Sequence, residues 1–341
     1  MTGSLSFYFV DVFASEPLTG NPLALVPDAD HVDESRMRAI AREFNQSETT
    51  FLLSPNLPGA TCRLRSFTPS GAEVGGAGHN ALGAWLWLEA TGRLLNQGSD
   101  LAQEIAGAVL PVEIIRDPGR PAAVSMEQSP PQFAEPLTDH DELADALGLD
   151  EDTLTRSAPA QVVSAGAAHL MVRVRDRTAV DRAAPDGPRL RAVLAAAGGE
   201  GCYLYSLDPV DTADAIAYTR FFNPTVGIVE DPATGTAAGP LVALLVALGD
   251  VPDGVTATVE QGLALGRPSR IQVSVSGTRV RVTGSDWSWP TAHSGSKGSP
   301  ARLRRRESQS HSLRVAVPAI TTSTKVGRPT QRVGAACGLP L

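Results

Sequence analysis

The chain has 341 residues, of which 42% are hydrophobic and 19% charged, as is typical of a globular protein with room for two ordinary domains. Its net charge is −8, but residues 293–341 hold nine Lys or Arg and one acid, which leaves 20 basic and 36 acidic residues in the rest of the chain. The acidic composition of the chain outside residues 293–341 argues against nucleic-acid binding, which requires a basic face.

The sequence pattern also argues against membrane and disulfide-rich classes. The apolar run at 241–248 is too short to span a bilayer. The N-terminal residues lack a basic segment, and Asp11 interrupts their apolar run, so they predict a strand rather than a signal peptide. Cys62, Cys202 and Cys337 are an odd number without metal-like spacing. We therefore expect a cytoplasmic protein without a zinc site or a disulfide framework.

The first half is predicted to combine short strands with two helices. Strands are expected at 6–13, 22–26, 47–53, 61–67, 108–115 and 123–128. Asp33 can cap a helix whose apolar positions, 37, 40, 41 and 44, follow the spacing of one helix face. A second helix follows the small-residue loop 75–83, ends near Gly92 and is apolar nearly all round, as expected of a helix in the middle of a domain.

The second half repeats this order after Pro130-Pro131. Helices are expected at 139–147, 189–197 and 241–248. Strands are expected at 161–163, 170–174, 201–206, 217–222, 257–261, 270–276 and 279–284. The helix at 241–248 again follows a small-residue turn, the segment EDPATGTAAGP at 230–240, whose Gly239-Pro240 predicts a local irregularity.

Two small-residue loops that each open a buried helix are the most informative feature of the chain. A helix N-terminus carries unpaired N–H groups and a partial positive charge, so it is a natural seat for a carboxylate. The predicted fold is α+β, with two similar lobes, each a strongly curved mixed β-sheet or barrel around a central apolar helix, and an active site in the cleft between them. The N-terminal lobe is expected at 1–129, the C-terminal lobe at 130–292, and a disordered basic tail at 293–341.

Three explanations compete for the tail. It could be a tethering arm, a reading-frame artefact or a cryptic nucleic-acid tail. A dispensable tail is favoured because the pattern of strands is complete by Gly284.

Five sequence blocks resemble, in order, those of the PhzF family, the phenazine-biosynthesis isomerases and their relatives with the diaminopimelate-epimerase-like fold. The blocks are DVF at 11–13 with GNPLA at 20–24, NQSET at 45–49, RSFTP at 65–69, Glu73 with Gly78-His79, and EDPATGTA at 230–237. They lie within residues 5–285. A lone Gly-His pair would mean little, whereas five blocks in family order are a specific signal.

The resemblance implies catalytic roles for three residues. Glu48 corresponds to the general base of the family, His79 to the histidine of its Gly-His pair, and Asp231 to the aspartate of its Asp-Pro block. The resemblance also implies a role in a secondary-metabolite pathway and a homodimer.

The resemblance also implies a carboxylate site at the two helix starts. Gly78, Gly235 and Thr236 correspond to the loop groups that hold the substrate acid, and Asn80 is grouped with them, although the family has a small apolar residue there. The chain is one residue longer than usual before Glu73 and its loop 75–77 is smaller, which predicts a changed pocket.

The residues leave alternatives open on their own terms. Glu48 opens an apolar strand, where burial would raise its pKa and suit it to acid–base work, or it caps a turn or pairs with an arginine. His79 is kept neutral by the helix dipole, or is only a capping residue. Asp231 precedes Pro232 and so lies outside the helix, which it, Thr234 or Thr236 could simply cap. The other histidines considered are expected at surface or structural positions: His31, His140 and His169.

The leading hypothesis is a cofactor-independent isomerase that moves a double bond by proton transfer in a small unsaturated carboxylate or amino acid. No dinucleotide fingerprint, P-loop or metal-ligand spacing is present in the sequence, so no cofactor or metal is expected. Epimerisation by two thiols is disfavoured because neither loop contains a cysteine. The alternative is a non-catalytic ligand-binding or interaction member of the family. The expected partners are a small carboxylate substrate and a second copy of the chain, without nucleic acid or membrane.

Overall fold

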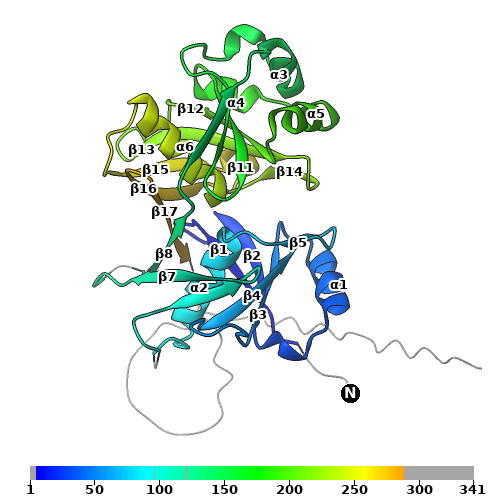
Figure 1. Cartoon of the computed structure of the whole chain (residues 1–341), viewed down its shortest axis with the longest axis vertical. Coiled ribbons are helices and arrows are strands. Elements are labelled where there is room, and N and C mark those ends of the chain that lie inside the picture. Colours follow the sequence, from blue (N-terminus) through cyan, green and yellow to red (C-terminus); the bar gives the residue numbers. More distant parts are fainter. Residues whose placement is uncertain (1–4, 96, 120, 288–341) are drawn as a thin grey trace, which may run out of the picture. The chain divides into compact units, whose positions relative to one another are not determined.

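The structure, a computed structural model, describes residues 5–95, 97–119 and 121–287. The described residues from Ser6 onward belong to one compact unit, and the fold given below is theirs (Figure 1). The predicted tail at 293–341 lies outside the described residues.

Runs of strands are separated by single helices or helix pairs along the described chain. The α-helices are α1 (Glu34–Phe44), α2 (His79–Ala90), α3 (His140–Leu147), α4 (Arg177–Arg182), α5 (Gly187–Ala197) and α6 (Gly235–Leu248), and the short 3-10 helices are η1 (Ala29–His31), η2 (Glu151–Thr153) and η3 (Leu263–Leu265). The strands of the first half are β1 (Tyr8–Val12), β2 (Asn21–Val26), β3 (Thr49–Leu53), β4 (Cys62–Phe67), β5 (Glu73–Val74), β6 (Ala102–Ile105), β7 (Ala108–Ile115) and β8 (Ala123–Gln128). Those of the second half are β9 (Gln132–Pro136), β10 (Gln161–Ser164), β11 (Ala168–Arg173), β12 (Gly201–Ser206), β13 (Ala215–Asn223), β14 (Ile228–Asp231), β15 (Thr256–Gln261), β16 (Ser269–Ser276) and β17 (Arg279–Trp287).

Local sequence signals set the ends of the helices. The N-cap aspartates of four helices each accept a hydrogen bond from a backbone N–H of the first turn: Asp33, Asp139, Asp176 and Asp186. Left-handed C-cap residues end four helices: Asn45, Gly148, Gly198 and Gly249. The prediction that Asp33 caps α1 is therefore confirmed.

Strand pairing among the first-half elements closes on itself through β17. Hydrogen-bonded neighbours run from β1 through β2, β3, β4, β6, β7, β8 and β17 and back to β1, with β2–β3 and β4–β6 parallel and the other pairs antiparallel. From β17 the pairing continues through β16, β15, β13, β12, β11, β10 and β9. All described strands thus belong to one 17-stranded mixed sheet, and a pairing path that returns to its first strand requires strong curvature.

The two predicted apolar helices are present and buried. Residues His79 to Leu88 of α2 are buried, and this helix contacts β1, β2, β3, β8 and β17. Residues Ala237 to Leu245 of α6 are also buried, and this helix contacts β10, β11, β16 and β17. Both belong to the larger hydrophobic core, while α3, α4 and α5 share a second core with β11, β12 and β13. α6 continues through Pro240, so the predicted irregularity there does not interrupt the helix.

The sequence prediction missed some short or exposed elements. These are β5, β6, β9, β14 and α4. α4 has only six residues, too few to display a helical period, and every residue of β9 is exposed, so it lacks the apolar alternation of a half-buried strand. The predicted strand at 47–53 begins later than expected, at Thr49, which places Glu48 just before β3.

Candidate active site

The segment that carries Glu48 is held between a helix end and a strand. α1 ends at Phe44, and Asn45 turns the chain in the left-handed region with a φ of 50°. Glu48 lies two residues after Gln46 and directly before the first residue of β3. The side chain is therefore placed by two regular elements rather than by a long loop.

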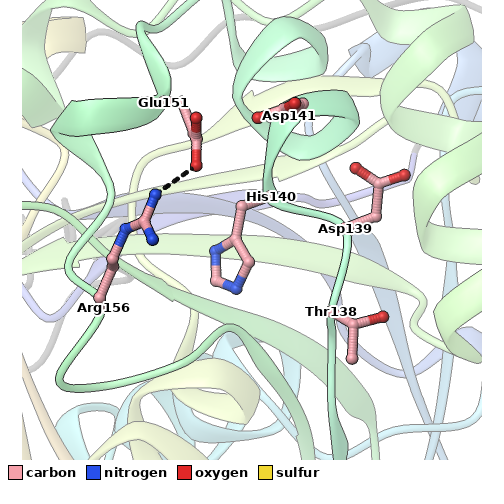
Figure 2. Close-up of a pocket in the computed structure, with 6 residues that line it drawn as sticks. All are labelled: Thr138, Asp139, His140, Asp141, Glu151 and Arg156. Carbon is pink, nitrogen blue, oxygen red and sulfur yellow. Dashed lines mark hydrogen bonds and ion pairs between the residues drawn. The ribbon is translucent and has the colours of Figure 1, made fainter.

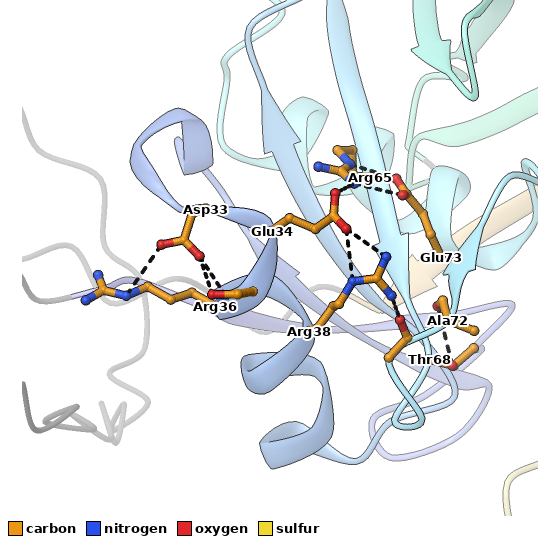
Figure 3. Close-up of polar contacts among 10 residues, drawn as sticks. Asp33, Glu34, Arg36, Arg38, Arg65, Thr68, Ala72 and Glu73 are labelled. Carbon is orange, nitrogen blue, oxygen red and sulfur yellow. Dashed lines mark hydrogen bonds and ion pairs between the residues drawn. The ribbon is translucent and has the colours of Figure 1, made fainter. Parts of the chain in front are cut away.

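A network of charged side chains fastens α1 to β4 and β5 (Figure 3). Arg65 of β4 donates to Glu34 of α1 at 2.8 Å and to Glu73 of β5 at 2.7 Å. Arg38 of α1 also donates to Glu34 and to the carbonyl of Gly71, in the turn between β4 and β5. Networks of this kind stabilise more than isolated surface pairs do. Arg65 of the RSFTP block therefore links α1 to β5.

Glu48 presents a buried oxygen that lacks a partner. The residue is partly accessible, but its Oε2 is out of contact with solvent and has no hydrogen-bond partner among the described residues. Burial, and secondly the charge of Asp231, raise the pKa of Glu48 to about 8. The alternatives in which this oxygen caps a turn or pairs with an arginine do not hold in the described structure. A carboxyl group that titrates near neutral pH can both take up and return a proton.

Asp231, the last residue of β14, lies in the same site. Asn21 donates to its Oδ1 at 2.9 Å and Thr234 donates to its Oδ2 at 2.6 Å. The hydroxyl of Ser47 lies nearby and donates to Asn21 Oδ1 at 3.5 Å. Burial raises the pKa of Asp231 to about 6, although these hydrogen bonds act in the opposite direction. The hydroxyl of Thr234 therefore donates to Asp231. Thr234 occupies the N-cap position of α6, but its side chain does not cap the helix.

Gln261, at the end of β15, fixes the turn that follows Asp231. Its Oε1 accepts from the backbone N–H of Thr234 at 3.1 Å, and its Nε2 donates to the backbone carbonyl of Asp231 at 2.7 Å. Asn21 completes the support by donating to the carbonyl of Ala233 at 2.8 Å. The turn before α6 is thus held by side chains from β2 and β15.

His79 is the first residue of α2 and is 6% exposed. Its Nε2 is buried without a partner among the described residues. Burial lowers the pKa of His79 to about 4, so the ring is neutral at physiological pH and can donate one hydrogen bond. The described structure shows no hydrogen bond between this ring and Glu48 or Asp231, so its catalytic role stays a prediction.

The starts of α2 and α6 meet. A Cβ placed on Gly78, the N-cap of α2, would lie 3.5 Å from Thr236 Cγ2. Gly235, the first residue of α6, is equally close-packed, because a Cβ there would lie 3.2 Å from the ring of Phe13. Three of the predicted carboxylate-site residues, Gly78, Gly235 and Thr236, are therefore neighbours in space.

Asn80 uses its amide within the protein. It is 1% exposed, its Oδ1 accepts from the N–H of Gly78 at 2.7 Å, and its Nδ2 donates to the carbonyl of Gly76 at 3.0 Å and to Ser66 Oγ at 3.1 Å. This is a reversed cap of the kind in which a side chain of the first turn binds the N-cap N–H. Its role as a substrate contact stays a prediction, and the N–H of Gly78 is already paired.

His169, expected at a surface or structural position, is buried beside the start of α6. It is 3% exposed and its Nε2 lies 3.3 Å from Thr236 Oγ1. Sequence reasoning also missed Asn21, Ser47 and Gln261. Asn21 and Ser47 lie inside family-like blocks and could have been found there, whereas His169 and Gln261 are isolated on strands, and only the fold brings them to Asp231 and α6.

A surface pocket of about 550 Å³ is lined by none of the candidate active-site residues described above (Figure 2). It is lined by Thr138, Asp139, His140, Asp141, Glu151 and Arg156. Its ion pair, Arg156 to Glu151 at 2.7 Å, has side chains that are 84% and 44% exposed, so it contributes little to stability. His140 is thus a partly exposed residue at the first position of α3, as expected.

The described cysteines lie in strands rather than in the loops that open α2 and α6. Cys62 lies in β4 and Cys202 in β12, both as buried free thiols. Burial raises the pKa of both thiols to about 12, so neither is a thiolate at neutral pH. Within residues 5–287 no group of three or more His, Cys, Asp or Glu side chains could hold a metal ion. The helices of that part of the chain are also too short or too polar to cross a membrane.

Comparison with known proteins agrees with these motifs. The family model of phenazine biosynthesis-like proteins, PhzC-PhzF, matches residues 10–287. The chain belongs to the PhzF family. It is 35% identical over 282 residues to the trans-2,3-dihydro-3-hydroxyanthranilate isomerase of Pseudomonas aeruginosa, an alignment that covers 81% of this chain and 92% of that enzyme. It is 33% identical to the uncharacterized isomerase YddE of Escherichia coli, with 82% and 97% covered.

The fold agrees as well. The crystal structure of the Bacillus anthracis phenazine biosynthesis protein of the PhzF family superposes with a TM-score of 0.76 at 28% identity, and the match covers 83% of this chain and 96% of that one. The predicted α+β class and the predicted isomerase are confirmed at this level. The enzyme is an isomerase of the PhzF type.

Proposed function

We propose that this enzyme is a cofactor-independent isomerase that moves a double bond by proton transfer in a small unsaturated carboxylate. The observation that carries the proposal is the buried carboxyl oxygen of Glu48. Glu48 has a buried oxygen without a partner, and the charge of Asp231 adds to burial in raising the pKa of Glu48 to about 8. A base of this strength that is not already hydrogen-bonded is suited to removing a proton from carbon.

The reaction balances with one proton and one base. Glu48, as a carboxylate, removes the proton from a carbon next to the double bond, and the electron pair shifts through the allylic system. The protonated Glu48 then returns the proton to the far carbon on the same face, which regenerates the carboxylate. Neither an oxidant nor a reductant is needed.

Asp231 and His79 act as assisting groups in this scheme. Asp231, with a pKa of about 6, is largely ionised at neutral pH, and its charge makes Glu48 a stronger base. His79, with a pKa of about 4, is neutral and can donate a hydrogen bond to negative charge that develops on the substrate. A neutral donor would not draw the proton away from Glu48.

For the substrate we propose a cyclic unsaturated amino acid of the dihydro-hydroxyanthranilate class from a secondary-metabolite pathway. Support comes from the P. aeruginosa relative, which is named for that substrate. The acid group would be held by Gly78, Asn80, Gly235 and Thr236. Because the side chains of loop 75–77 are small, a differently shaped unsaturated amino acid is the second candidate substrate.

A non-catalytic binding protein fits the same observations less well. A buried carboxyl oxygen without a partner lowers stability, and a protein that only binds gains nothing from it. Epimerisation by two thiols fits less well still, because the helix starts carry Gly78 and Thr234 rather than cysteine.

We also propose that residues 1–129 and 130–292 form two lobes, one around α2 and one around α6. Support comes from the contacts of α2 with β1, β2, β3 and β8 and of α6 with β10, β11 and β16, while β17 contacts both helices. A cytoplasmic homodimer is proposed from the family resemblance, and the free thiols of Cys62 and Cys202 are consistent with a reducing compartment.

Proton NMR of the enzyme with trans-2,3-dihydro-3-hydroxyanthranilate in deuterium oxide tests the proposal. We expect the vinyl signals to move with the double bond while deuterium enters one carbon. Deuterium exchange without migration would indicate an epimerase, and carboxylate binding with no chemistry at all would indicate the binding protein.

A further inference from the structure

His169 is held rigidly beside the start of α6. It lies in β11 next to β12, where Gly201 is its pairing partner. A Cβ on Gly201 would lie 3.3 Å from His169 Nδ1, so the glycine leaves just enough room for the ring. Phe221 meets the ring edge to face, with centroids 5.0 Å apart. These contacts leave Nε2 directed at Thr236 Oγ1, at 3.3 Å.

The two ring nitrogens differ in their surroundings, and this difference defines the tautomer. Nδ1 is buried without a partner among the described residues, whereas Nε2 has the hydroxyl of Thr236. Burial lowers the pKa of His169 to about 4, so the ring carries a single proton at neutral pH. Buried N–H groups are left unpaired less often than buried acceptors are, so the proton belongs on Nε2.

The tautomer determines what Thr236 can do. If Nε2–H donates to Thr236 Oγ1, the hydroxyl keeps its own hydrogen for another acceptor, and accepting a bond makes it a better donor. The backbone N–H groups of Ala237 and Ala238 both bond to the carbonyl of Thr234, but no partner is described for those of Gly235 and Thr236. Three donors can therefore converge at the start of α6.

The start of α2 is not equivalent. The N–H of Gly78 is already bonded to Asn80 Oδ1 at 2.7 Å. That N–H would have to leave Asn80 before it could bind a ligand, whereas the donors of α6 need no such rearrangement.

We propose that His169 is a positioning residue that orients the Thr236 hydroxyl as a hydrogen-bond donor to the substrate carboxylate, which is held mainly by the start of α6. This inference rests on the proposed function and deepens it, because it assigns the acid group of the substrate to one of the two helix starts.

The tautomer is tested without any ligand. Long-range proton–nitrogen NMR of the histidine rings distinguishes the two neutral tautomers, and the signals of His169 are assigned by their loss in His169→Gln. We expect the Nε2–H tautomer for His169. An Nδ1–H tautomer would leave Nε2 accepting from Thr236, and would overturn the inference.

The role in binding is tested by calorimetry with 3-hydroxyanthranilate, a stable aromatic carboxylate, and with its carboxamide. We expect His169→Phe and Thr236→Val each to weaken acid binding about tenfold and carboxamide binding much less, since a hydrogen bond to a charged group contributes most. His169→Gln, whose amide can still donate, should stay within about threefold of wild type. The variant that combines His169→Phe with Thr236→Val should lose no more affinity for the acid than either single variant does.

The outcomes separate the two claims. Unchanged acid binding in His169→Phe, or equal losses for acid and carboxamide, would overturn the positioning role. If wild-type enzyme binds neither compound, the proposed substrate class fails, while the tautomer measurement still decides the inference. Melting curves of each variant show that a weaker affinity is not the result of unfolding.

Discussion

Asn21 donates its side-chain amide to the carboxylate of Asp231 at 2.9 Å, although 210 residues separate the two in the chain. The same amide donates to the carbonyl of Ala233 at 2.8 Å. One side chain of β2 thus ties the GNPLA block to the EDPATGT block and fixes the carboxylate whose charge acts on Glu48.

Replacing Asn21 by Ala should lower the free energy of unfolding by about 2–3 kcal/mol, because a buried carboxylate and a buried carbonyl each lose a donor. Turnover should fall as well, since Asp231 becomes harder to ionise. Urea unfolding measures the first effect. Asn56→Ala, at an exposed position, is the matched control. Equal stability of the two variants would show that Asn21 is not a structural tie.

Stability should depend on pH through Glu48. Its pKa is raised from an ordinary value of 4.5 to about 8, so between these values the folded protein holds a proton that the unfolded chain has lost. The free energy of unfolding therefore decreases as pH rises across that window. Glu48→Gln removes this titration, so its urea-unfolding curve should change less between about pH 5 and about pH 8. Parallel pH dependence in both proteins would mean that Glu48 titrates normally.

The rate should rise with pH in the same range. In the free enzyme only the ionised form of Glu48 can accept a proton from carbon, so kcat/KM should increase to a plateau above about pH 8. Asp231 and His79, with pKa values of about 6 and about 4, have lost their protons by then. Initial rates at low substrate concentration give the profile. A rate that falls between pH 6 and pH 8 would show that protonated Glu48 begins the reaction.

Gly239 is required for the contact between α6 and β8. A Cβ there would lie 1.8 Å from Gln128 Oε1, and Gln128 Nε2 donates to the carbonyl of Gly235 at 3.0 Å. Gly239→Ala should therefore reduce stability by about 1–3 kcal/mol through overpacking. Gly98→Ala has open space around the new methyl group and serves as the control. Recovery of part of the loss by Gln128→Ala would identify the clash as the cause.

Much of this arrangement could be predicted from the sequence, because its signals are local. The apolar runs of α2 and α6, the Asp33 cap and the small-residue loops are each readable within a few residues. The family-like blocks likewise point to Glu48, His79 and Asp231. The structure adds that the charge of Asp231 helps to raise the pKa of Glu48 and that Gly78 lies beside Thr236.

The remaining features depend on contacts between distant segments. His169 and Gln261 stand alone on their strands, and nothing near them in the chain marks a polar role; strand pairing brings them to the turn before α6. The hydrogen bond from the N–H of Gly78 to Asn80 could not be predicted either, because a side chain that binds the backbone looks the same in sequence as one that binds a ligand. Exposed β9 and short α4 had no periodic pattern to detect.

The central claim is that Glu48 carries the proton, and it is tested most directly with Glu48→Gln, which keeps the size of the side chain and removes the base. Proton NMR in deuterium oxide would follow double-bond migration in trans-2,3-dihydro-3-hydroxyanthranilate, while calorimetry with 3-hydroxyanthranilate measures binding by the same preparation. We predict that the variant binds the acid within a few-fold of wild type but isomerises it at least about a thousandfold more slowly. Turnover close to that of wild type, with deuterium entering the same carbon, would contradict the account.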